Sequence, residues 1–240
     1  MVNALKPNEV SNKKIFFFDA GPIISLMISR LIEFLPELKK QSGGKFYITP
    51  AVRKELVERP LSIHRFEFEA LQVMKYINDG VLDIYDQVPN RKVADLIALA
   101  NNSFSIKGKT MDVIQSGEME SVASALELGA TVVMDERTLR LFIEKPTGMV
   151  KLLEGRFKSK VVVNKDKMKA FQKQLENIQI IRSIELAGVA YKMGLLDSYI
   201  PQQKDGKSVL IESVLYATKY GGCAVTENEI EEIKEMLLEK

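Results

Sequence analysis

The sequence predicts an α/β fold, a three-layer α/β/α sandwich with a mainly parallel central sheet. Three short apolar runs, residues 15–18, 46–48 and 131–134, have the length of strands buried on both faces of such a sheet. Each run is followed within a few residues by a helix signal, and strands that alternate with helices through short connections favour parallel pairing. The 240 residues, 46% of them hydrophobic, can bury a core without disulfides.

The first half of the chain gives these elements in order. Apolar residues at helical spacing predict a helix over residues 23–40, after the strand 15–18. Thr49 and Pro50 are typical of a helix start, and Pro60 ends that helix. A third helix is expected over residues 62–78, with Gly80 as its stop. A strand over residues 81–85 and a helix over residues 90–101 follow.

The second half begins clearly and then loses its pattern. After a polar loop at residues 107–109 come a helix over 117–128, the strand 131–134 and a helix over 137–144. Beyond Pro146 the alternation fades, and helices are expected only at residues 184–193, 209–220 and 227–238, the last with Thr226 and Glu229 as a capping box. We therefore expect a catalytic domain at residues 10–150 and a mostly helical extension at 151–240, which can also be part of the same domain.

Composition excludes several kinds of site. Cys223 and His64 are the only cysteine and the only histidine, so no internal disulfide, thiolate cluster or multi-histidine zinc site can form. The net charge of +2 is too small to indicate a nucleic-acid partner, so any polyanion must bind to a local patch. The apolar run 15–28 is interrupted by Asp19, Gly21 and Pro22 and is too short to span a membrane. We expect a cytoplasmic protein without a membrane segment.

Two predicted strands lead directly into an acidic residue. Asp19 follows the first strand, and Asp135 follows the strand 131–134. The carboxyl ends of parallel strands lie at one edge of a sheet, so both side chains are expected at the same rim. Hard divalent cations such as Mg²⁺ are held by carboxylates of this kind. The alternative is that each aspartate only caps the helix that follows it.

Two further acids lie at the edge of the apolar stripe of a predicted helix. Glu55 lies beside the buried stripe of its helix, whereas Glu58 is spaced for an exposed ion pair with Lys54. Glu118 lies in the first turn of the helix 117–128, at the edge of its apolar stripe.

The remaining acids near these helices are not expected to bind a metal ion directly. We place Glu120 on the solvated face of the helix 117–128, together with Ser124 and Glu127. Glu136 follows Asp135 directly and is expected to reach a bound metal through water.

Four segments resemble, in order, the four motifs of PIN domains. They are residues 16–26, 49–56, 117–126 and 132–140, and the first is closest to the subgroup in which the Asp is followed by Ser or Gly and then Pro. The resemblance implies a PIN-like fold and Asp19, Glu55, Glu118 and Asp135 as active-site acids. It implies Mg²⁺ or Mn²⁺ held by Asp19, Glu118, Asp135 and Glu136.

The resemblance also implies an activity. Toxin-type PIN proteins are endoribonucleases, usually with a cognate protein inhibitor and often homodimeric, so RNA, an antitoxin-like inhibitor and a second copy are the expected partners. Two positions depart from the family pattern. Gly21 stands where many members carry Ser or Thr, and Glu136 stands where Asp or Asn is commoner. Residues 151–177 are longer than a compact PIN domain requires.

Substrate contacts are expected from basic residues. We expect Arg140, Lys158 and Lys160 to contact RNA phosphates. Phe157 and Phe171 interleave with the lysines of residues 151–173 and would offer a stacking surface. A solvated lysine-rich helix explains the same pattern.

Two other functions fit parts of the sequence. One is a catalytically silent nucleic-acid-binding or regulatory module, which would use the segment beyond Pro146 as a partner surface. The other is a phosphohydrolase with a nucleophilic Asp. That chemistry requires a second Asp two residues later, where this chain has Gly21.

Overall fold

The computed structural model describes residues 14–144 and 146–239, and its centre is a parallel sheet. The strand order is β3-β2-β1-β6-β8, and all four pairings are parallel. The strands are β1 (Ile15–Phe18), β2 (Lys45–Ile48), β3 (Asp83–Ile84), β6 (Thr131–Val133) and β8 (Gln179–Ile181). The prediction of an α/β fold with a mainly parallel central sheet is therefore confirmed.

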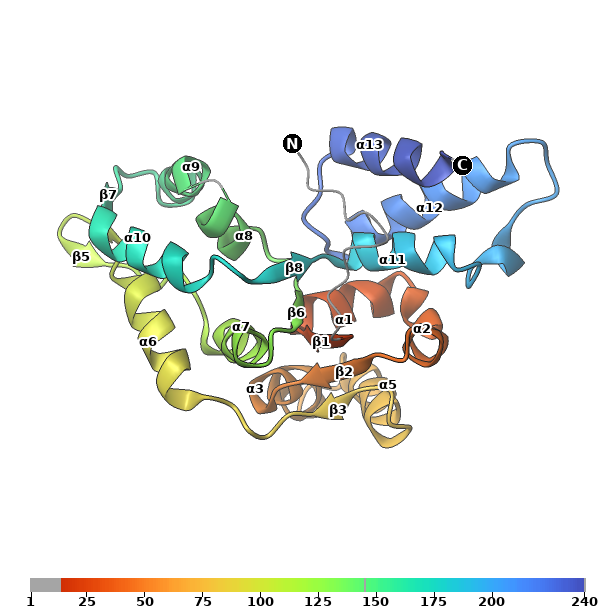
Figure 1. Ribbon diagram of the computed structural model, residues 1–240, viewed down its shortest axis with the longest axis horizontal. Helices are drawn as coiled ribbons and strands as arrows, with labels where there is room; N and C mark the ends of the chain where they lie inside the picture. Colours follow the sequence, from red (N-terminus) through yellow and green to blue (C-terminus); the bar gives the residue numbers. More distant parts are fainter. Residues whose placement is uncertain (1–13, 145, 240) are drawn as a thin grey trace.

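Helices pack on both faces of this sheet, an arrangement compatible with three layers (Figure 1). Side chains alternate along each strand, so Phe17 packs into one core and Phe18 into the other. The Phe17 core is covered by α6 (Asn90–Asn101), α7 (Ser116–Leu128), α8 (Arg137–Glu144), α9 (Pro146–Phe157) and α10 (Lys165–Gln174). The Phe18 core is covered by α1 (Ala20–Ile28), η1 (Leu31–Phe34), α2 (Leu35–Ser42), α5 (Glu67–Asn78), α11 (Ser183–Lys192), α12 (Gly206–Gly221) and α13 (Glu227–Leu238).

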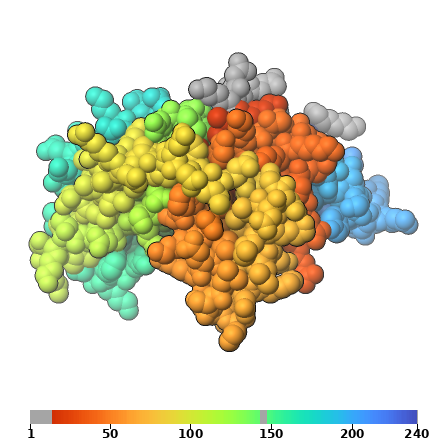
Figure 2. Space-filling model, turned by 90° about the horizontal axis from the view of Figure 1, so that it is seen from below, coloured from red at the N-terminus to blue at the C-terminus, as the bar shows by residue number. Residues whose placement is uncertain are grey.

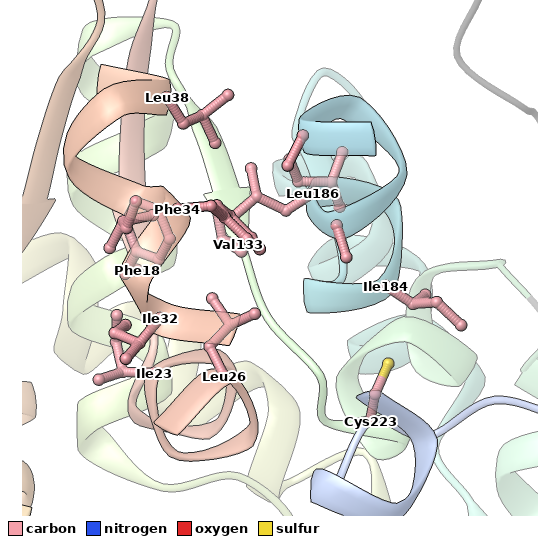
Figure 3. Close-up of a cluster of buried hydrophobic side chains, with 14 of the residues drawn as sticks. Phe18, Ile23, Leu26, Ile32, Phe34, Leu38, Val133, Ile184, Leu186 and Cys223 are labelled. Atoms are coloured by element: carbon pink, nitrogen blue, oxygen red, sulfur yellow. The ribbon is translucent and has the colours of Figure 1, made fainter. Parts of the chain in front are cut away.

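The sheet takes its last strand from the carboxy-terminal third of the chain. The sequence pattern did not predict β8, whose three residues pair with β6 in the register Val133 with Ile181. Figure 3 shows Ile184 and Leu186 of α11 beside Val133 of β6, in one cluster with Phe18 of β1. The expected boundary at residue 150 falls inside α9, and residues from both sides of it build both cores. The expected start at residue 10 lies outside the described residues.

The single helix expected over residues 23–40 is wrong, because the chain breaks it at Arg30. Arg30 adopts φ 59°, a left-handed conformation that a continuous helix cannot contain. The Ser29 hydroxyl donates to the carbonyl oxygens of Ser25 and Leu26 and so caps α1. Three separate elements result, α1, η1 and α2, and Pro36 lies in the first turn of α2, where it needs no amide hydrogen.

Other helices and strands also differ from the predicted bounds. The helix expected over 62–78 begins only at Glu67, and the strand expected over 81–85 has the two residues of β3. The predicted helix from Pro50 to about Pro60 is present as α3 (Pro50–Arg53), a π-helical turn η2 (Lys54–Glu58) and α4 (Arg59–Leu61). Figure 2 views the molecule from the β3 side, where the segment from α3 to α6, orange to yellow, forms much of the near face.

The polar loop expected at residues 107–109 is the turn of a β-hairpin. Lys107 and Gly108 both have positive φ, at 49° and 77°, as a tight hairpin turn requires. The hairpin strands belong to a small antiparallel sheet of order β5-β4-β7. Its strands are β4 (Phe104–Ile106), β5 (Lys109–Thr110) and β7 (Val162–Val163). The expected helices near residues 184–193, 209–220 and 227–238 are confirmed as α11, α12 and α13. No helix in the described ranges combines the length and the apolar character needed to cross a membrane.

The expected solvated face of α7 is confirmed for Glu127, which is exposed, but is wrong for Ser124 and Glu120. Ser124 is fully buried, and Glu120 is partly buried with its carboxylate accepting a hydrogen bond from the Ala51 amide at 3.1 Å. The cause is that α3 packs across α7, so this helix is covered on two sides. Within the described part of the chain, the Ser121 and Ser124 hydroxyl oxygens have no hydrogen-bond partner.

We expect Ser124→Ala to stabilise the protein by about 1 kcal/mol, because a buried hydroxyl without a partner is unfavourable and alanine is the better helix former. Guanidinium unfolding measures the change. Ser103→Ala is the matched control, since that fully buried hydroxyl donates to the Leu99 carbonyl at 2.7 Å and its loss should be destabilising. Equal destabilisation by both substitutions would contradict the expectation.

Candidate carboxylate site

Asp19 and Asp135 lie together at the carboxyl ends of the adjacent strands β1 and β6. The pairing places Phe18 opposite Val133, and the Asp19 amide donates to the Val133 carbonyl at 2.9 Å. Both aspartates are almost fully buried, with exposed fractions of 7% and 4%. A β-carbon added to Gly21 would lie 3.5 Å from Oδ2 of Asp19 and 3.6 Å from Cβ of Asp135. The two acids therefore flank Gly21 at one rim of the sheet.

Two more acids approach this rim from helices. Glu118 is in the first turn of α7, partly buried. Glu55 is exposed and lies in the π-helical turn η2, a local widening of the helix that is frequent at functional sites. A β-carbon added to Gly117 would lie 3.9 Å from Oε2 of Glu55, so the Glu55 carboxylate adjoins the start of α7.

Burial and the neighbouring acids raise the pKa values of Asp19 and Glu118. Burial, with the negative charges of Glu55 and Asp135 adding to it, raises the pKa of Asp19 to about 6, against two opposing backbone hydrogen bonds. Burial also raises the pKa of Glu118 to about 8, and the charges of Glu136, Asp19 and Glu55 add to that increase. Each charged side chain that shifts these two pKa values is acidic. The five acids therefore form one electrostatic unit that favours bound protons or a cation.

Burial of Glu118, together with repulsion from the neighbouring acids, predicts how metal-free stability depends on pH. The raised pKa of Glu118 means that the folded state binds its proton more tightly than the unfolded state does. The resulting stabilisation is complete below the unfolded pKa, near 4.5, and is lost as the pH rises through about 8. Glu118→Gln keeps an uncharged side chain at every pH. In EDTA we expect its free energy of unfolding to exceed that of the wild type at pH 9, with the difference shrinking toward pH 5.

Denaturant unfolding of both proteins at several pH values measures this difference. A gap that stays constant from pH 5 to pH 9 would show that Glu118 does not titrate in this range.

The chemistry of this site fits a divalent cation better than its present geometry does. All the candidate ligands are carboxylate oxygens, the donors that Mg²⁺ and Mn²⁺ favour. Nevertheless, no three histidine, cysteine, aspartate or glutamate residues among those described are arranged to hold one metal ion. Glu118 accepts a hydrogen bond from the Gln115 amide at 3.3 Å, and Glu136 accepts one from the Leu139 amide at 2.9 Å. Glu118 thus caps the start of α7 from its first turn, and Glu136 caps the start of α8 from the residue before it.

Of the expected substrate-binding residues, Arg140 is already in an ion pair, and the two lysines lie on a connection away from this rim. Arg140 on α8 forms an ion pair with Glu229 at 3.6 Å. Lys158 and Lys160 are exposed on the connection from α9 to β7, which lies at the left end of the molecule in Figure 1, whereas β1 and β6 are near its middle. The expected stacking role of Phe171 is wrong, because its ring is fully buried and packs 4.5 Å from that of Phe142. Phe157 is 49% exposed.

Two residues at the rim were missed from sequence. The Ser183 amide and hydroxyl donate to the two carboxylate oxygens of Asp135, and nothing in the sequence links residues 48 positions apart. The second is Glu120, whose carboxylate accepts a hydrogen bond from the Ala51 amide. The Thr49 hydroxyl accepts from the Val52 amide, so the Ala51 amide at this helix start needs another acceptor, and the sequence does not show that Glu120 provides it.

The comparisons with known proteins do not identify a relative. A scan against protein-family models, a search of curated proteins and a search of solved structures each found no match to this chain.

Proposed function

We propose that this chain is a PIN-like, divalent-metal-dependent endoribonuclease with a three-layer α/β/α fold. One observation carries the proposal: Asp19 and Asp135 are buried carboxylates that flank Gly21 at the carboxyl ends of adjacent parallel strands. This rim is where open α/β sheets bind ligands. Glu55 and Glu118 adjoin it, and the raised pKa of Glu118, about 8, supports a shared need for a cation.

In this proposal Mg²⁺ or Mn²⁺ is held by Asp19, Glu118, Asp135 and Glu136. Glu55 is the remaining acid of the active site at which RNA is cleaved. When bound, such an ion lowers the pKa of a water and stabilises charge on the leaving oxygen of a phosphodiester. The chain needs no nucleophilic side chain. Its one histidine is exposed, and burial raises the pKa of the Cys223 thiol to about 12, so that thiol is unreactive.

The proposal extends to the partners of toxin-type PIN proteins. These are RNA held by Arg140, Lys158 and Lys160, an antitoxin-like protein inhibitor, and a second copy of the chain, all in the cytoplasm. Because Arg140 is paired with Glu229, RNA would have to compete for its guanidinium group.

The test is cleavage of labelled single-stranded RNA by the purified protein. With Mn²⁺ or Mg²⁺ we expect internal cleavage that EDTA abolishes and that excess metal restores. Cleavage that persists in EDTA would exclude the metal-dependent reaction. If neither single-stranded nor hairpin RNAs are cleaved, a catalytically silent module becomes the better assignment.

That second function, a catalytically silent nucleic-acid-binding or regulatory module, is favoured by one specific observation. Glu118 and Glu136 already accept backbone hydrogen bonds, and among the residues that the structure describes no metal-holding group of three is formed. A nuclease would need these side chains to turn toward the ion, whereas a silent module would not. Failure to bind Mn²⁺ in a titration would exclude the nuclease, whereas Mn²⁺ binding without RNA cleavage would favour a silent module that keeps a metal-only site.

A further inference from the structure

Ser183 makes two hydrogen bonds to Asp135, and its side chain also lies beside the Cys223 thiol. Its amide donates to Oδ1 at 2.8 Å, and its hydroxyl donates to Oδ2 at 2.7 Å. Ser183 is fully buried and Asp135 is 4% exposed, so water does not compete for these bonds. Ser183 therefore binds both oxygens of the Asp135 carboxylate and fixes the plane of that group.

The sheet brings these two residues together. The β6–β8 register sets Val133 opposite Ile181, and the Met134 amide donates to the Ile181 carbonyl at 2.8 Å. Asp135 and Ser183 each lie two residues beyond their paired strand residue. Ser183 is the first residue of α11, a ten-residue helix whose amino-terminal dipole favours a negative charge at this position.

The rim acids differ in how they are held. The Asp19 side chain accepts hydrogen bonds from the amides of Ala20 and Gly21 directly beside it, the latter at 3.4 Å, and Glu55 lies on an exposed turn. Asp135 is held differently, by short bonds to both carboxylate oxygens from Ser183, which lies 48 residues further along the chain. Each Asp135 carboxylate oxygen keeps a second lone pair, so the bonds from Ser183 still allow a metal ion to bind.

We propose that Ser183 is a positioning residue, which orients the Asp135 carboxylate for the divalent ion and the RNA phosphate. The inference rests on the proposed function, because it assigns Ser183 a role in that same site. Groups that hydrogen-bond to ligating carboxylates tune affinity through orientation, and their loss typically weakens metal binding or activity by about 10- to 100-fold.

The test compares Ser183→Ala with Ser183→Thr and with Ser124→Ala. Ser183→Ala removes only the hydroxyl and leaves the amide bond to Oδ1. Ser183→Thr keeps a hydroxyl at the same atom. Ser124→Ala makes the identical change at an equally buried serine that does not contact Asp135. Thermal unfolding first establishes that each variant is folded. If the added methyl group of threonine disturbs packing, the comparison of Ser183→Ala with Ser124→Ala alone tests the role of the Ser183 hydroxyl.

The primary readout is Mn²⁺ affinity without RNA, from the free Mn²⁺ signal in electron paramagnetic resonance. We expect Ser183→Ala to bind Mn²⁺ about 10-fold or more weakly, with Ser183→Thr and Ser124→Ala near the wild type. At saturating Mn²⁺, kcat for RNA should fall in Ser183→Ala while KM stays unchanged. A wild type that binds Mn²⁺ and cleaves RNA, with Ser183→Ala unchanged in both, overturns the role of Ser183 alone. A wild type that does neither overturns the proposed function and this inference with it.

Discussion

Asp19→Asn should abolish metal-dependent RNA cleavage while leaving the fold intact. The substitution removes one of the two buried negative charges that flank Gly21, and with it a ligand for the proposed ion. A loss of about 4 kcal/mol of transition-state stabilisation corresponds to a decrease in kcat of about 10³-fold. Asparagine is as good a helix cap as aspartate, so the bond from the Gly21 amide that begins α1 can persist.

Stability separates this result from simple unfolding. Burial and neighbouring acids raise the pKa of Asp19 to about 6, so at pH 8 the metal-free wild type carries an unfavourable charge there that the variant lacks. In EDTA at pH 8, Asp19→Asn should therefore be at least as stable as the wild type. Asp95→Asn, on the exposed side of α6, is the matched control and should keep full activity. Full activity in Asp19→Asn would refute the assignment of the site.

Gly221→Ala should destabilise the protein by about 3 kcal/mol, the upper part of the range for forcing an extra carbon into a packed core. A β-carbon at this position would lie 2.5 Å from the carbonyl oxygen of Ser25, closer than such atoms approach one another. That oxygen belongs to the backbone of α1 and also accepts hydrogen bonds from the amide and hydroxyl of Ser29. The Ser25 carbonyl cannot turn away without losing these bonds at the end of α1, so α12 would have to shift instead.

The control for Gly221→Ala is the same change where there is room. A β-carbon at Gly155, on α9, meets nothing within 4 Å, and its backbone lies in an ordinary helical segment. Gly155→Ala should stabilise the protein by up to about 1 kcal/mol through helix propensity. Differential scanning calorimetry should place the Gly221→Ala midpoint roughly 6–12 °C below the wild type. A midpoint within 2 °C would mean that α12 does not pack against α1 this closely in solution.

Sequence pattern predicted those parts of the fold in which local signals agree. The apolar runs of β1, β2 and β6 and the periodic helices α7 and α13 were all placed within about two residues. Pattern failed where tertiary contacts decide. The three residues of β8 are too few to show a period, and they form a strand only because β6 is there to pair with them. The break at Arg30 depends on hydrogen bonds from Ser29 that no apolar spacing reveals.

The candidate site was predictable to the same extent. Acids that directly follow strands must lie at the carboxyl rim, which is why the proximity of Asp19 and Asp135 could be expected from sequence. Helical phase distinguished Glu118 from Glu120 less well, since α3 covers the face assigned to solvent. The contact between Asp135 and Ser183 depends on the β6–β8 register, which local sequence does not contain.

The late position of β8 has a consequence for synthesis of the protein. A nascent chain that has emerged only as far as α8 contains Asp19, Glu55, Glu118 and Asp135, yet β6 is then the open edge of a four-stranded sheet. Open edges pair readily with other strands, so this intermediate is exposed to misassembly. The fifth strand and Ser183 are translated only after residue 178. A chain interrupted before that point holds all four acids, but Asp135 lacks the two hydrogen bonds that Ser183 donates.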